Sequence, residues 1–240
     1  MSGKVLVGTS GWHYKHWRGL FYPADLRTDE WLKFYSQHFR TVELNNSFYR
    51  LPTHAAFDTW RDVSPRGFVF AVKGSRFTTH MKKLKDPKPS TEKFFDAAAH
   101  LRSKLGPILF QLPPHWKVDK RRLEEFLEKM PKSHQYAFEF RDESWLNEGI
   151  YEVLERQNAA LCIHDLGGRQ SPIELTAKFT YIRFHGPTAA RYSGSYSQRA
   201  LEEWADRFKR WNLKSIYAYF NNDIGGHAPR NAATLIELLK

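Results

Sequence analysis

The chain has 240 residues, a length that suits one large domain or two small ones. Apolar residues make up 41% of it and aromatic residues 15%, which excludes a disordered chain. The 37 Lys and Arg residues exceed the 26 Asp and Glu residues and give a formal net charge of +11, which favours anionic partners such as nucleic acid or phosphorylated metabolites.

Short apolar runs alternate with amphipathic segments along the chain. The runs predict strands over Val5–Thr9, Thr41–Asn45, Phe68–Lys73, Ile108–Leu112, Tyr136–Arg141, Ala160–Asp165, Thr180–His185 and Ile216–Asn221. Helical spacing of apolar residues predicts helices over 28–39, 54–63, 90–105, 119–130, 148–157, 198–211 and 228–239. The connection 166–178, between the sixth and seventh strands, is predicted to hold at most a short helix.

Eight strands alternating with helices predict an α/β fold of the TIM-like (β/α)₈ barrel type, whose usual length is about 250 residues. A doubly wound open sheet is the alternative, but it usually has fewer strands. No linker rich in Pro or Gly divides the chain, and no internal repeat is present. The sequence therefore predicts one domain over residues 1–240.

The cysteine content and the N-terminal segment bear on the cellular compartment. Cys162 is the one cysteine, so a disulfide within the chain is impossible, which fits a reducing compartment. The N-terminus lacks the apolar region of a signal peptide, and no apolar stretch is long enough to span a membrane. We therefore expect a cytoplasmic protein without a membrane partner.

Polar residues occur within the predicted strands at positions that alternate with bulky apolar ones. Because alternate side chains of a barrel strand face the helices and the lumen, these polar residues are expected to point inward. They are Glu43, Asn45, Lys73, Gln111, Glu139, Arg141, Arg183, His185, Tyr219 and Asn221. In the sixth strand the register is open between His164 and Asp165. Active sites of this fold lie at the carboxyl ends of the strands, where these residues lie.

Several segments resemble the DUF72 family, which includes YecE-like proteins. They are "GTSGWHYKHWRGLFYP", "VELNNSFYRLP", "FAVKGSRFTTH", "ILFQLPP", "FEFRDESW", "YIRFHG" and "YFNND…GGHAPRNA", in this order over nearly the whole chain. The resemblance implies a TIM-barrel-like fold and carries no established activity. The residues that match its motifs include Ser10, Trp12, Glu43, Asn45, Tyr49, Lys73, Gln111, Glu139, Arg141, Trp145, Arg183, His185, Asn221 and Asn222.

The inward residues can perform general acid–base chemistry. Glu43 and Glu139 form a carboxylate pair, and His185 is a third proton carrier. Lys73 is expected to act through its charge, although a desolvated lysine can also form a Schiff base. The alternative is a structural layer of ion pairs, but burying so many charges for stability alone is unfavourable.

Other chemistries remain open from these residues. No cofactor is required, but a divalent metal is possible on Glu43, Glu139, His185 and either His164 or Asp165, although no tight ligand motif is present. A glycosidase would use the two carboxylates, with Trp12 and Tyr14 stacking on a sugar, whereas Trp17 is expected to pack in the core.

The loops after the last strands add candidate residues for anion binding. Gly225 and Gly226 open the final helix, where backbone N–H groups favour phosphate, and the "GPTAARYSGSYS" loop could be a mobile lid from which Tyr192 reaches the ligand. Two basic clusters, "HMKKLKDPK" and "KVDKRR", lie beyond the third and fourth strands and could extend the pocket for a nucleic acid.

The sequence thus predicts an enzyme that acts on a phosphorylated or other anionic substrate by acid–base and electrostatic catalysis. Its predicted type is a hydrolase of phosphodiesters or phosphate esters. Its alternative is a nucleic-acid or nucleotide binding protein without turnover. Glu43, Glu139, His185 and Lys73 are the predicted catalytic residues. The residues predicted to bind or orient the substrate are Ser10, Trp12, Asn45, Tyr49, Gln111, Arg141, Arg183, Tyr192, Tyr219, Asn221, Asn222, Gly225 and Gly226.

Overall fold

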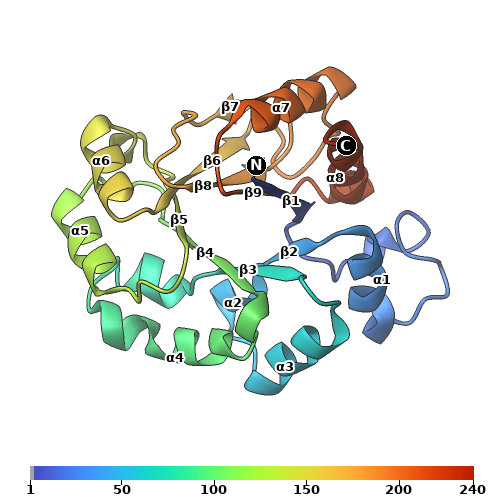
Figure 1. The fold of residues 1–240 in the computed structure, drawn as a ribbon, viewed down its shortest axis with the longest axis horizontal. Coiled ribbons are helices and arrows are strands. Elements are labelled where there is room, and N and C mark those ends of the chain that lie inside the picture. The colour runs from blue at the N-terminus through green and yellow to red at the C-terminus, as the bar shows by residue number, and fades with distance from the viewer. Residues whose placement is uncertain (1–2) are drawn as a thin grey trace.

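The alternating apolar runs become the strands of a barrel in the computed structural model, which describes residues 3–240 (Figure 1). The parallel strands of this barrel are β1 (Lys4–Thr9), β2 (Thr41–Leu44), β3 (Val69–Lys73), β4 (Leu105–Gln111), β5 (Tyr136–Glu139), β6 (Ala160–Leu166), β8 (Phe179–Phe184) and β9 (Ser215–Phe220). The TIM-like barrel is therefore confirmed. The first two residues of the predicted domain lie outside the described residues.

Helices surround the strands, as Figure 1 shows. They are α1 (Trp31–His38), α2 (Asn46–Tyr49), α3 (His54–Val63), α4 (Pro87–Ala99), α5 (Lys120–Lys129), α6 (Glu148–Arg156), α7 (Gln198–Arg210) and α8 (His227–Leu238). Polar residues begin several of them: the side chains of Thr53, Asp119, Asn147 and Ser197 each accept a hydrogen bond from a backbone N–H of the first turn.

Two connections differ in detail from the sequence prediction. Residues 166–178 hold no helix; instead β7 (Arg169–Gln170) turns back and pairs antiparallel with the end of β6. The Gly167–Gly168 pair makes this turn, since both residues have positive φ angles that favour glycine. After β2, the residues predicted as loop form the one-turn helix α2.

The barrel is weakly paired at one place, between β1 and β2, which we call the seam. The sheet order is β1-β9-β8-β6-β5-β4-β3-β2, so β1 and β2 are the two edges that must meet to close it. Within residues 3–240, the ladder contact between these edges is the isolated bridge from Ser10 to Glu43. The seam is thus paired only at the carboxyl ends of the strands.

The side chain of Tyr35, from α1, closes the rest of the seam. Its hydroxyl accepts a hydrogen bond from the Thr9 N–H at 2.9 Å and donates one to the Thr41 carbonyl at 3.0 Å. At Gly8 the edges approach so closely that a Cβ atom would lie 2.2 Å from the Thr41 carbonyl oxygen. A side chain inserted between two strands therefore replaces part of a backbone ladder.

The strand side chains divide into two apolar layers, as their alternation predicts. Phe70, Phe138 and Phe184 belong to the large core shared with the helices. The lumen holds a smaller cluster: Leu6, Ala71, Leu109, Ala137, Ala160, Cys162, Phe179, Tyr181, Tyr217 and Tyr219. The predicted inward and outward registers are therefore confirmed for these strands.

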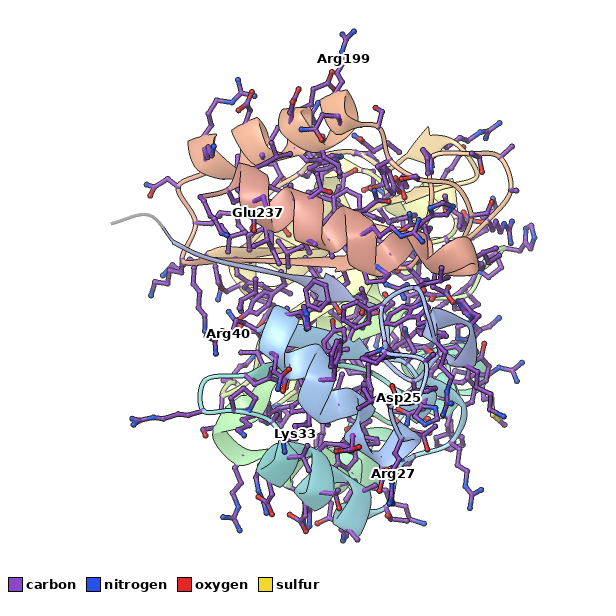
Figure 2. The ribbon with its side chains drawn as sticks, turned by 90° about the vertical axis from the view of Figure 1, so that its right-hand side faces the viewer. Asp25, Arg27, Lys33, Arg40, Arg199 and Glu237 are labelled. Carbon is purple, nitrogen blue, oxygen red and sulfur yellow. The ribbon has the colours of Figure 1, made fainter. Side chains whose placement is uncertain are left out.

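Charged side chains cover the outside of the helices. Figure 2 shows Lys33 of α1, Arg199 of α7 and Glu237 of α8 at this outer surface, where all three are exposed. Among residues 3–240, no helix is both long enough and apolar enough to cross a membrane.

We predict that Tyr35→Phe destabilises the fold by about 1–3 kcal/mol, because buried backbone groups of Thr9 and Thr41 lose a hydrogen-bond partner. Urea unfolding at constant m value measures this change. Tyr136→Phe is the matched control, since its hydroxyl makes one hydrogen bond, to the Pro131 carbonyl. An equal loss in both variants would contradict the role of Tyr35 in the seam.

Candidate functional site at the barrel mouth

Two buried glutamates and one buried arginine meet at the carboxyl end of the lumen. Glu43 comes from β2, Glu139 from β5 and Arg183 from β8. Arg183 donates from Nη2 to Glu43 Oε1 at 2.8 Å and from Nη1 to Glu139 Oε2 at 2.6 Å. One guanidinium group thus joins three strands that are not neighbours in the sheet.

Both glutamates are ionised at neutral pH. Burial by itself would raise the pKa of Glu43, but the charge of Arg183 and the hydrogen bond from the Tyr181 hydroxyl, at 2.6 Å, hold it below its usual value. Burial acts in the same way on Glu139, but Arg141, paired with its Oε1, and Arg183 hold its pKa well below the usual range. The two carboxylates are therefore fixed negative charges.

His185 is held as a neutral imidazole. Burial disfavours its charged form, and repulsion by Arg183 adds to this, so its pKa lies well below the usual value. Arg141 Nη2 lies 3.3 Å from Nε2, and Asn221 Nδ2 lies 3.0 Å from Nδ1. Both neighbours are donors, and the neutral ring can accept a hydrogen bond at only one of its two nitrogens.

Of the two residues of the sixth strand for which the sequence left the direction open, His164 is the one that points inward. Cys162 lies in the lumen cluster, so His164, two residues on, faces the same way, and its ring lies 6.3 Å from that of His185. Asp165 faces the other side, where its carboxylate accepts hydrogen bonds from the His185 N–H, at 2.6 Å, and from the Tyr196 hydroxyl. Asp165 thereby holds the start of the "GPTAARYSGSYS" loop.

Lys73 is the cation of the mouth that has no partner of opposite charge. It ends β3 and is only 9% exposed, yet its ammonium group takes part in no ion pair or hydrogen bond among residues 3–240. Its Nζ lies 4.1 Å from the centre of the Phe48 ring. Burial, followed by repulsion from Arg183, lowers the pKa of Lys73 from 10.5 to about 8, although Glu139 and Glu43 act to raise it.

A cavity of about 450 Å³ opens beside Glu43 at the rim of the mouth. Trp12, Tyr14 and Trp60 form its aromatic walls, and Asn45 contributes an amide. The Trp12 and Trp60 rings meet edge to face at 5.2 Å, so one wall of the cavity is a rigid aromatic pair. Such a cavity offers stacking surfaces and hydrogen-bonding groups to a polar ring.

Some of the residues predicted to bind substrate have other partners in this fold. Tyr219 lies deep in the lumen, where its hydroxyl is 2.8 Å from Thr41 Oγ1. Asn222 is buried and donates to the Gly194 carbonyl and to Asn231 of α8. These residues support the lumen wall and the loop after β8 and do not line the mouth.

Other predicted residues lie around the rim. Ser10 is buried at the seam bridge beside Glu43, and Gln111, at the end of β4, is partly exposed. Tyr49 points into solvent and is 82% exposed. Tyr192 lies over His185, with 5.6 Å between the ring centres.

The glycine turn before α8 forms as predicted, with both glycines at positive φ angles. Its Gly226 N–H donates to the Asp223 carbonyl, and the Asp223 carboxylate lies 3.4 Å from His16 Nε2. The turn thus already contains a carboxylate, which disfavours a second anion there.

The donors proposed for a metal are not gathered at one point. Within the described range 3–240, no three His, Cys, Asp or Glu side chains form a group that could hold a metal ion.

Comparison with known proteins agrees with this architecture. The model of the family described as "Protein of unknown function DUF72" matches residues 6–240. The chain belongs to the DUF72 family. It is 29% identical to the UPF0759 protein YunF of Bacillus subtilis, over 98% of this chain and 94% of that protein.

Solved structures of this family have the same fold. A DUF72 family protein of Thermotoga maritima is 32% identical, with a TM-score of 0.86 over 98% of this chain and 99% of that one. One from Enterococcus faecalis is 19% identical, with a TM-score of 0.81 over 98% and 95%. D-psicose 3-epimerase of Clostridium cellulolyticum, at 10% identity and a TM-score of 0.52 over 98% of each chain, shares the barrel fold.

Three residues of this DUF72 site are absent from the sequence prediction. Tyr181, which bonds Glu43, lies two residues before Arg183 and therefore has the same inward register, a signal that the sequence contains. Phe48 and Trp60 belong to α2 and α3, and their contacts with Lys73 and Trp12 arise only when these helices fold over the mouth.

We predict that Lys73→Met stabilises this DUF72 protein at pH 7 by about 3 kcal/mol, the free energy that corresponds to the whole pKa shift of Lys73. The folded pKa of about 8 lies below the unfolded value of 10.5, so the unfolded state binds more protons between these two pH values. The free energy of unfolding of the wild type should therefore rise with pH across this window, and the advantage of the variant should shrink there. Below pH 8 the penalty is fully present.

Urea unfolding of the two proteins between pH 7 and pH 10 measures this difference. Lys82→Met is the matched control, because the Lys82 side chain is 40% exposed and paired with Asp86; its effect at pH 7 should be within about 0.5 kcal/mol. A Lys73→Met protein that is less stable than the wild type at pH 7 would show that Lys73 stabilises the fold.

Proposed function

We propose that this protein is an enzyme that binds an anionic substrate at the barrel mouth and acts on it by proton transfer. The observation that carries the proposal is the unpartnered, nearly buried ammonium group of Lys73. A buried charge without a partner is costly, so a site that retains one is suited to a ligand of opposite charge.

The charge balance of the mouth supports an anionic ligand. The carboxylates of Glu43 and Glu139 face three cations, those of Lys73, Arg141 and Arg183, while His185 is neutral. The carboxylates are already paired with the two arginines, so one positive charge remains in excess. A phosphate or carboxylate group of a substrate would neutralise it.

The pKa values suggest how the roles are divided. Lys73, with a pKa of about 8, can take up and release a proton near neutral pH and is the best general base or acid of the group. Glu43 and Glu139 remain in the proposal as the charges that hold Arg183 in place. Neutral His185 can accept a proton at Nε2 only if Arg141 moves away from it.

Hydrolysis of a phosphate ester is the reaction we propose within this scheme. Lys73 in its neutral form would activate a water molecule, and the excess positive charge would stabilise the negative charge that develops on the phosphoryl oxygens. The aromatic cavity beside Glu43 would receive the leaving group. No cofactor is needed for these steps.

We predict that inorganic phosphate stabilises the wild type against heat. At ten times its dissociation constant it should add about 1.4 kcal/mol, or roughly 3–5 °C in Tm. Lys73→Met should lose this shift, and Lys33→Met, at an exposed position of α1, should keep it. An equal shift with sodium chloride at the same ionic strength, or an undiminished shift in Lys73→Met, would contradict an anion site at Lys73.

Turnover is tested by following a mixture of phosphate monoesters and diesters by phosphorus NMR. The wild type should release inorganic phosphate or a monoester, and Lys73→Met should not. Lys73→Arg separates an enzyme from a binding protein, because arginine keeps the positive charge that binds phosphate but cannot act as a base near neutral pH: an enzyme should keep its affinity for phosphate but lose rate.

We propose nucleic-acid binding as the second candidate function, favoured by a groove of about 620 Å³. Lys82, Lys88 and Lys129 line it together with Phe77, so it combines positive charge with a surface on which a base can stack. Lys82 and Lys88 come from the first of the two predicted basic clusters. Asp86 lies in the same groove and weakens its charge.

For this candidate we expect a single-stranded DNA oligonucleotide to bind with an affinity that falls as salt rises. Replacing Lys82, Lys88 and Lys129 by Ala should lower the slope of log K against log salt by about 2, at roughly 0.7 for each lost contact. Replacing Lys33, Arg40 and Arg66 instead removes the same charge elsewhere. Fluorescence anisotropy that shows equal losses in both triple variants would argue against the groove.

A further inference from the structure

The environment of Lys73 is that of a nucleophile. Its backbone is anchored, because the Ser47 hydroxyl donates to the Lys73 carbonyl at 2.6 Å. Its Nζ rests on the face of the Phe48 ring at 4.1 Å, which holds the side chain without donating or accepting a hydrogen bond. The amine is therefore positioned, while its lone pair is left without a protein partner when the group is neutral.

Access and protonation also suit a nucleophile. Lys73 keeps 9% of its surface exposed, so a small molecule that enters the mouth can reach it. With a pKa of about 8, about one tenth of the Lys73 amines are neutral at pH 7, compared with roughly one in three thousand for an ordinary lysine. A general acid or base does not need to lie against an aromatic ring, as Lys73 lies against Phe48. An amine that attacks a carbonyl, in contrast, must be desolvated and oriented.

We infer that Lys73 forms an imine with a carbonyl carbon of the anionic substrate. This inference rests on the anionic substrate of the proposed function and assigns Lys73 the role of nucleophile in place of that of general base in hydrolysis. The substrate class is then a small aldehyde or ketone that carries a carboxylate or phosphate group. The reaction class is then one in which the imine withdraws electrons from the neighbouring carbon, so that a proton on that carbon can be removed.

The covalent step balances without a further reagent. The Nζ lone pair attacks the carbonyl carbon, a proton leaves the nitrogen, and the carbonyl oxygen takes up a proton to give a carbinolamine. This intermediate takes a second proton from solvent and loses water, which leaves a protonated imine. Glu43 and Glu139 are negative charges that favour this cation, as they favour the ammonium form of Lys73.

The experiment uses the full chain with pyruvate as a carbonyl probe that bears a carboxylate and acetone as one without charge. Sodium cyanoborohydride at pH 7 reduces any imine to a secondary amine, and peptide mass spectrometry assigns the modified lysines. Lys82 is the internal control, since it also lies near an aromatic ring, 5.8 Å from the centre of Phe77, but is partly exposed and paired with Asp86. Lys73→Arg keeps the positive charge and cannot form the imine.

We expect pyruvate to modify Lys73 about tenfold or more faster than Lys82, because the Lys73 amine is neutral more often than that of an ordinary lysine and is held against Phe48. Pyruvate should also react faster than acetone at Lys73, and Lys73→Arg should show only slow labelling of surface lysines. Circular dichroism of Lys73→Arg verifies that this variant is folded.

Modification of Lys73 no faster than of Lys82 would overturn the imine, even if phosphate still stabilises the wild type through Lys73 and supports the proposed function. Selective labelling of Lys73 that is equally fast with acetone would support the imine and contradict the anionic substrate. The two proposals therefore fail in different experiments.

Discussion

The contact of Arg183 with Glu43 and Glu139 determines how the barrel mouth is organised. One guanidinium group binds carboxylates from β2 and β5, and neither of these strands is a neighbour of β8 in the sheet order. Each partner would be an uncompensated buried charge without the others, so the three side chains constrain one another. Glu43 also takes part in the seam bridge to Ser10, which couples the ion network to the closure of the barrel. The ion network and the Tyr35 hydroxyl thus both help to close the barrel, and they act at different levels along the strands.

The same network explains why Lys73 is distinctive. A purely structural layer of ion pairs would use every charge, and four of the five charges at the mouth are indeed paired with one another. Lys73 is outside this arrangement, although it is almost as buried as the others. Arg183 and Arg141 lower its pKa further, because the carboxylates that could neutralise it are already bound to those arginines. The site therefore combines a network of ion pairs, in which four charged side chains hold one another in place, with one unpaired amine, that of Lys73.

Aromatic side chains at the rim of the mouth form walls around these charged groups. Trp12 and Trp60 provide an aromatic wall beside Glu43, and Tyr192 covers His185 from the loop after β8. That loop is attached at both ends: Asp165 bonds the His185 N–H and the Tyr196 hydroxyl, and Asn222 bonds the Gly194 carbonyl. A ligand at the mouth would thus touch elements from opposite ends of the chain, which is usual for a fold whose loops gather at one face of the barrel.

The sequence by itself determined the strand order in the chain, the inward register of Glu43, Lys73, Glu139 and Arg183, and the face on which they gather. These follow from the alternation of side chains along a strand, which is a local property. Tertiary structure alone decided the partners, because these depend on contacts between residues far apart: Glu43 and Arg183 are 140 residues apart, and Tyr181 is 138 residues from Glu43. The choice of His164 over Asp165, the β7 turn in place of a helix, and the isolation of Lys73 were decided in the same way. A pattern of side chains shows which groups enter the lumen, but only the closed barrel shows which of them is left without a partner.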